Sequence, residues 1–180
     1  MNLLLRISSA IDGLNTRVGR LACWLILIAV VVSSANAVSR KALSLSSNGM
    51  LEIQWYLFSA VFLLCAGYTL LNNGHVRVDL VFTRLSRRHQ LLVEIFGTVF
   101  FLMPLVALIL SLSWSPFMQA WTSGEVSANA GGLVRWPVKL LIPIGFSLLL
   151  LQGLSQLIKS VDEFRRLPRG ENIDAATPAH

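Results

Sequence analysis

Few side chains in this sequence are of the types that carry out chemistry, and their spacing does not group them. His75, His89 and His180 all lie outside the long apolar runs, so none is placed to ligate a haem inside a membrane. The patterns HExxH, GxSxG and the phosphate-binding P-loop do not occur. Cys23 and Cys65 each lie within an apolar run, where cysteine behaves as a small hydrophobic residue. The sequence therefore predicts no enzyme activity, no metal site and no cofactor.

The acidic residues Glu52 and Glu94 lie at the ends of apolar runs and not at their centres. Proton relays and ion pathways place ionisable groups at mid-membrane, where a charge costs at least about 2.5–3.5 kcal/mol. The apolar runs of this chain hold no such group at their centres. We therefore do not expect the chain to drive ion-coupled transport by itself.

Gln152 and Gln156 are polar residues inside the last apolar run, with Ser155 beside them. They are four residues apart and so share one face of a helix. Such groups hydrogen-bond between membrane helices for about 0.6–2 kcal/mol. Packing within this chain and contact with another membrane protein both explain the pair.

Long apolar runs must position these residues, because 54% of the 180 residues are hydrophobic and only 13% are charged. A soluble domain carries about 25% charged residues. A hydrocarbon core of about 30 Å takes roughly 20 helical residues, and helices satisfy all backbone groups in lipid. The sequence predicts an all-α integral membrane protein whose four spanning helices cover about 21–38, 53–71, 91–114 and 140–158.

The basic residues predict the orientation of these spans. One side of the membrane would hold Arg6, Arg17, Arg20, Arg77, Arg84, Arg87, Arg88, Lys159, Arg165, Arg166 and Arg169. The other side would hold Arg40, Lys41, Arg135 and Lys139. The richer side faces the cytoplasm, so both termini are expected there. The net charge of +6 lies at span ends, where it meets anionic lipid headgroups, and no basic stripe indicates nucleic acid.

The first 20 residues have a pattern of their own. Apolar residues recur at helical spacing along one face, namely Leu3, Leu4, Ile7, Ala10, Ile11, Leu14, Val18 and Leu21. This predicts an amphipathic helix over 1–20 that lies in the cytoplasmic membrane interface. A cleaved signal peptide is the alternative, because Ala35-Asn36-Ala37 resembles a cleavage site. The polar segment 159–180 is predicted to be a disordered cytoplasmic tail.

The loops carry weaker signals. Asp79 can cap a short helix in the loop 72–89, and Arg77 beside it can meet phosphate headgroups or a partner. The loop 115–137 holds glycines and prolines and is expected to be irregular. The tryptophans lie near span ends, as in an aromatic belt, and Trp55 is one turn from Glu52.

Several short stretches together resemble the small membrane subunit (DctQ-like) of tripartite ATP-independent periplasmic (TRAP) transporters. They are EIQWYLF at 52–58, GHVRVD at 74–79, GEVS at 124–127, GGLVRWPVK at 131–139, IPIG at 142–145 and LQG at 151–153. The family writes Gly-Gly-Leu-Pro where this chain has Val134, which loosens one turn of the outer loop. The resemblance covers about 51–158.

This resemblance implies a non-catalytic subunit of the bacterial inner membrane. Its partners would be a large membrane subunit, which holds the substrate and ion sites, and an extracytoplasmic protein that delivers an organic acid. Uptake would be driven by an ion gradient. The motif residues expected to maintain the fold or subunit contact are Glu52, Trp55, Arg77, Asp79, Glu125, Trp136 and Lys139, with Gln152 added from its spacing. A membrane anchor of a redox enzyme and an orphan structural or sensor protein are the alternatives.

Overall fold

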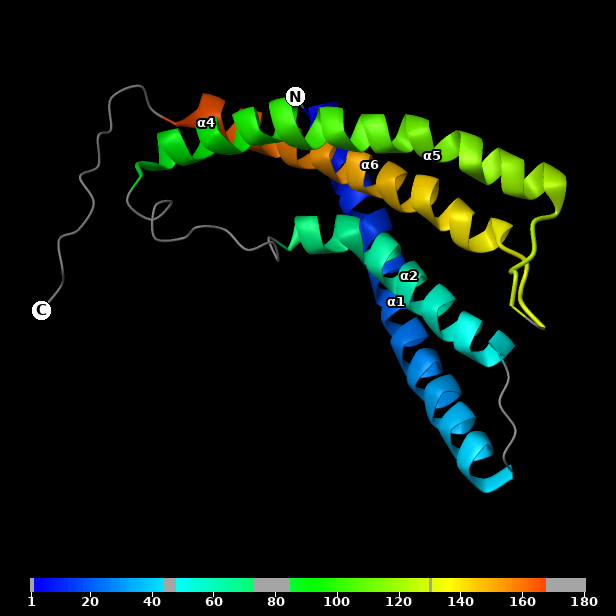
Figure 1. The fold of residues 1–180 in the computed structure, drawn as a ribbon. Coiled ribbons are helices and arrows are strands. Elements are labelled where there is room, and N and C mark those ends of the chain that lie inside the picture. The colour runs from blue at the N-terminus through cyan, green and yellow to red at the C-terminus, as the bar shows by residue number, and fades with distance from the viewer. Residues whose placement is uncertain (1, 44–47, 73–84, 130, 168–180) are drawn as a thin grey trace, which may run out of the picture.

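The computed structural model describes residues 2–43, 48–72, 85–129 and 131–167, which form long helices (Figure 1). The helices are α1 (Asn2–Leu43), α2 (Asn48–Leu71), α4 (Arg87–Gly97), α5 (Met103–Ser123) and α6 (Trp136–Arg166). A π-helical turn, Thr98–Leu102, joins α4 to α5 without a break. Four stretches are long and apolar enough to cross a membrane, namely α1, α2, the continuous α4–α5 helix and α6. The predicted all-α membrane fold with four spanning helices is confirmed.

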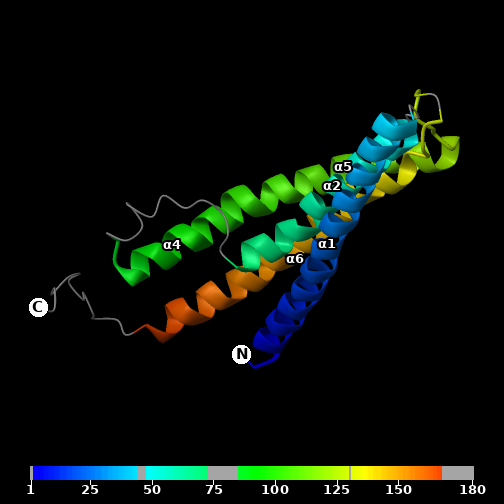
Figure 2. The same cartoon turned by 90° about the horizontal axis from the view of Figure 1, so that it is seen from below.

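Helix α6 is central, because it contacts α1, α2, α4 and α5. Figures 1 and 2 show α5 and α6 side by side along most of their length. Helix α2 runs in nearly the same direction as α6, whereas α1 crosses them at a steep angle and its later half diverges from α6. The first half of α1 therefore packs on α6, and α1 also packs against α2.

Helix α1 buries one residue in every seven along almost its whole length. The residues at this spacing are Ser8, Asn15, Ala22, Ala29 and Asn36, each less than 8% exposed, and Gly19 is buried among them as well. These side chains are either small, as in alanine, or short and polar, as in serine and asparagine. Neighbouring helix backbones can therefore approach closely. A strict seven-residue repeat also keeps one seam of a helix against its neighbours through a left-handed supercoil. This heptad seam fixes which side of α1 faces the protein.

The predicted interfacial segment is the first half of α1 and not a separate helix. With 42 residues, α1 is about 60 Å long, roughly twice the thickness of the hydrocarbon core. Leu3, Leu4, Ile7 and Leu14 point away from the protein and are exposed, whereas polar Ser8 faces inward. An apolar outer face is what a lipid environment favours. The location of residues 1–20 at the cytoplasmic membrane surface stays a prediction.

Two helices continue beyond the ends expected from sequence. The prediction of a loop over 115–137 is wrong for its first part, because α5 runs through Pro116 to Ser123. A proline does not end a helix readily where the alternative is unpaired backbone in lipid. Helix α6 runs to Arg166, so the predicted tail begins as helix. The helix expected after Asp79 lies outside the described residues.

The π-helical turn has a local cause in the sequence. Pro104 follows it and has no N–H to donate to the carbonyl four residues earlier. The Met103 N–H instead donates to the Thr98 carbonyl, five residues back. The third membrane-spanning stretch is thereby widened by one residue at this point.

Candidate functional site

The end of the molecule that we predict to face outward is organised around the buried carboxylate of Glu52. Glu52 lies just past the first turn of α2 and is 1% exposed. Its Oε1 accepts hydrogen bonds from Ser127 Oγ and from Asn129 Nδ2, the latter at 2.9 Å. Its Oε2 accepts one from the Leu133 N–H at 2.7 Å. One side chain of α2 therefore holds both arms of the loop between α5 and α6.

Two glycines with positive φ let the backbone of this loop turn back on itself. Gly124 ends α5 with φ 59°, and Gly131 turns the chain with φ 70°, a region that glycine enters without steric cost. An isolated antiparallel bridge joins Val126 to Val134. The Tyr56 hydroxyl donates to the Val134 carbonyl at 3.2 Å and ties the loop again to α2.

A second acidic residue of the loop, Glu125, binds the start of α6. Lys139 Nζ lies 2.5 Å from Glu125 Oε2, and an Arg135 guanidinium nitrogen lies 3.5 Å from Oε1. The hydrogen bond from the Lys139 ammonium holds the pKa of the Glu125 carboxyl below its usual range. Trp121 and Trp136 meet edge to face with centroids 4.6 Å apart, so α5 and α6 are joined here by rings as well.

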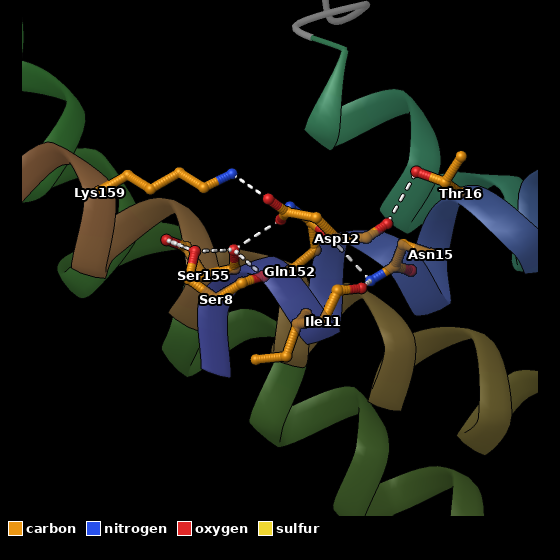
Figure 3. Close-up of polar contacts among 8 residues, drawn as sticks. All are labelled: Ser8, Ile11, Asp12, Asn15, Thr16, Gln152, Ser155 and Lys159. Carbon is orange, nitrogen blue, oxygen red and sulfur yellow. Dashed lines mark hydrogen bonds and ion pairs between the residues drawn. The ribbon is translucent and has the colours of Figure 1, made fainter. Parts of the chain in front are cut away.

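A larger polar cluster lies away from Glu52, where α1 crosses the middle and later part of α6 (Figure 3). We call it the inner polar cluster, and it consists of Ser8, Asp12, Asn15, Gln152, Ser155 and Lys159. The Asp12 carboxylate accepts from Gln152 Nε2 at 3.0 Å and from Ser155 Oγ at 2.7 Å, and it pairs with Lys159. All three donors belong to α6, so one carboxylate of α1 fixes the crossing.

Further hydrogen bonds in the inner polar cluster join Asn15 and Ser8 of α1 to α6. Asn15 Nδ2 donates to Gln152 Oε1 at 2.9 Å, and the Ser8 and Ser155 hydroxyl oxygens are 2.7 Å apart. Asn15, Gln152 and Ser155 are each at most 1% exposed. Buried polar groups that satisfy one another specify a single helix register, because a shift would leave them unpaired.

Gly67 of α2 locates this cluster along the helices. A Cβ atom on Gly67 would lie 2.2 Å from Asn15 Oδ1 and 3.2 Å from the Leu148 carbonyl oxygen. The three helices therefore meet at Gly67, one turn before α2 ends at Leu71. The remaining cluster members lie at or beyond the inner end of α2.

Farther along α6, an exposed ion pair and a hydrogen bond join it to α4. Arg87 donates to both carboxylate oxygens of Glu163, at 2.7 and 2.9 Å. Ser160 Oγ donates to Glu94 Oε2 at 3.3 Å. Exposed pairs of this kind contribute about 0–1 kcal/mol, so they orient α4 and add little stability.

The structure separates the predicted site residues into two groups. Glu52, Glu125 and Lys139 gather at the outer loop, with Trp55 and Trp136 nearby, whereas Gln152 lies in the inner polar cluster. Arg77 and Asp79 lie outside the described residues. Gln156, the partner of Gln152 in the sequence pattern, is half-buried beside α4 and α2.

Sequence reasoning missed the α1 half of the inner polar cluster. Asp12 and Asn15 were assigned only to a surface helix, yet they bind α6. A signal was present, because Ser8 and Asn15 begin the heptad seam that continues through Ala22 and Ala29. No three His, Cys, Asp or Glu side chains within the described ranges are grouped to hold a metal ion.

Replacing Asp12 with alanine should lower the stability of the chain by about 1.5–3 kcal/mol, the range for hydrogen bonds to a charged group. Asp12→Asn keeps an acceptor for Ser155 and should lose less. The measurement is unfolding in detergent, with Ser9→Ala as the control because Ser9 is exposed beside buried Ser8. Equal stability of Asp12→Ala and Ser9→Ala would show that the cluster does not hold α1.

Comparison with curated proteins and with solved structures gives no significant match. A family model does match, over residues 29–163, and its description is "Tripartite ATP-independent periplasmic transporters, DctQ component". The match spans the later part of α1, all of α2, α4, α5 and most of α6, including the outer loop and the α6 half of the inner polar cluster. This chain is therefore a member of the DctQ family, the small membrane component of TRAP transporters.

Proposed function

We propose that this chain is a non-catalytic scaffold that packs beside the large membrane subunit of a TRAP transporter. The assembled system takes up an organic acid, which an extracytoplasmic binding protein delivers, and an ion gradient drives the uptake. One observation carries this proposal beyond the family match. The carboxylates of Asp12, Glu52 and Glu125 are all bound by donors within the chain.

Fixed hydrogen bonds to donors of the same chain distinguish a structural carboxylate from one that carries a proton or an ion. A group that carries a proton or an ion must exchange partners during the cycle. Glu52 accepts three hydrogen bonds from one loop, and Asp12 accepts three from one helix. These contacts fix helices relative to one another. They support a rigid body that gives a moving partner a fixed surface.

The proposed orientation places both termini in the cytoplasm of a bacterium, with the chain in its inner membrane. Support comes from the basic residues Arg87, Lys159 and Arg165, which gather at one end of the helices. Segment 2–20 is proposed to remain in the mature protein, because Asp12 and Asn15 supply contacts to α6. Alkaline phosphatase fused after His180 should be inactive; an active fusion would reverse the orientation.

Reconstitution into liposomes tests the scaffold role. The chain alone, under an imposed sodium or proton gradient, should neither bind nor accumulate any of a panel of labelled organic acids. Co-expression with the large subunit and binding protein encoded beside it should yield a co-purifying complex that accumulates one of them. Uptake by the chain alone, or uptake by the large subunit with full activity in its absence, would refute the proposal.

A further inference from the structure

A groove of about 450 Å³ lies between α2 and α6 near their outer ends. Its walls are apolar, with Phe62 and Leu63 from α2 and Val138 and Ile142 from α6. Toward the membrane centre the helices close it. A Cβ atom on Gly145 would lie 2.7 Å from the Leu63 carbonyl oxygen, so the two backbones meet there. The groove therefore opens outward.

Two cations stand at the outer end of this groove. Arg135 and Lys139 both line it, and they are four residues apart at the start of α6. Within the described part of the chain, no carboxylate lines the groove. Glu125 binds the two cations from the loop and offsets one of their charges. The buried Glu52 carboxylate also interacts with Arg135 but does not line the groove, so the charged side chains that line it are both cations.

One N–H donor of Arg135 also has no acceptor among the residues that the structure describes. Its Nε is buried and has no hydrogen-bond partner within the described structure. The contacts within the chain therefore leave part of the Arg135 guanidinium without an acceptor. Guanidinium groups match the oxygens of a phosphate in geometry as well as in charge.

We infer that this groove binds an outer-leaflet phospholipid with an anionic headgroup. One acyl chain lies along Phe62, Leu63, Val138 and Ile142, and the phosphate meets Arg135 and Lys139. The two cations that line the groove favour an anionic headgroup over a zwitterionic one. Trp55, which borders the groove and is 43% exposed, marks the level of the headgroups. This site does not depend on the transport role proposed above, whereas its assignment to the outer leaflet rests on the proposed orientation.

Native mass spectrometry of the full chain in detergent tests the headgroup preference. The probe is an equimolar mixture of phosphatidylglycerol and phosphatidylcholine with the same acyl chains. The wild-type chain should retain phosphatidylglycerol preferentially, and Arg135→Gln and Lys139→Gln should each reduce its retention about fivefold. Lys41→Gln removes an exposed cation at the end of α1 and should change nothing. Equal retention of both lipids, or an equal loss in Lys41→Gln, would overturn the inference.

Photo-crosslinking in native membranes identifies the occupant without removing a charge. Phe62 is 79% exposed, so p-benzoylphenylalanine in its place should leave the helix packing intact. Irradiation of cells that hold the complete transporter should yield chain adducts with the mass of a phospholipid. Crosslinks to a second polypeptide without phospholipid adducts would assign the groove to a protein contact and overturn the inference.

Discussion

Replacing Glu52 with lysine is expected to open the outer loop and to reduce the yield of assembled transporter roughly tenfold or more. Ser127 Oγ and the Leu133 N–H would lose their acceptor, and each buried donor left unpaired costs about 1–3 kcal/mol. The new ammonium would also stand near Arg135, whose charge favours the Glu52 carboxylate. Two such losses exceed the ~1.4 kcal/mol that corresponds to a factor of ten.

The measurement is co-purification with an affinity-tagged large subunit. Glu171→Lys makes the same charge change in the polar C-terminal segment, outside the described residues, and should leave the yield unchanged. Glu52→Gln keeps the shape and one acceptor and should give an intermediate yield. If Glu52→Lys and Glu171→Lys assemble equally well, the carboxylate does not organise this end of the molecule.

Gly145→Leu is the second substitution with a large expected effect. Its Cβ would lie 2.7 Å from the Leu63 carbonyl oxygen and 3.0 Å from the Leu63 carbonyl carbon. These are backbone atoms, so α2 and α6 must separate for the side chain to fit. Overpacking of this kind costs about 1–3 kcal/mol and occasionally more, and unfolding in detergent would measure it.

Gly97→Ala is the matched control for this substitution. Gly97 is also helical, but nothing lies within 4 Å of a Cβ atom there. Alanine is more favourable than glycine in a helix by about 1 kcal/mol, so this variant should be as stable as the wild type or more so. A loss of stability at Gly97 equal to that at Gly145 would mean that glycine matters for a reason other than helix contact.

The four spans could be predicted from the sequence because hydropathy is a local property. About 20 apolar residues in a row identify a span without knowledge of its neighbours. Helix ends were harder to predict. Pro116 and the glycines near it signalled a loop after Trp114, yet α5 continues to Ser123. Residues that end a helix in water are tolerated where the backbone has no other hydrogen-bond partner.

The outer loop was partly accessible to sequence reasoning, since Glu52, Glu125 and Lys139 lie in motifs that resemble the family. The sequence did not tell whether Glu52 faces a partner or its own chain. The folded loop decides this, because it covers the carboxylate to 1% exposure and supplies donors 75 to 81 positions away. Contacts over such separations depend on how helices pack, which short-range patterns do not encode.

By itself, the sequence determined that this chain lies in a membrane, that it has four spanning helices, and that its face at Gln152 is polar. Only the tertiary structure decided what that face meets. Asp12 and Asn15 of α1 reach Gln152 and Ser155 because Gly67 lets three backbones come together at one level. Amphipathic spacing gives the direction of a side chain about its own helix axis, whereas its partner depends on the crossing of two helices far apart in the chain.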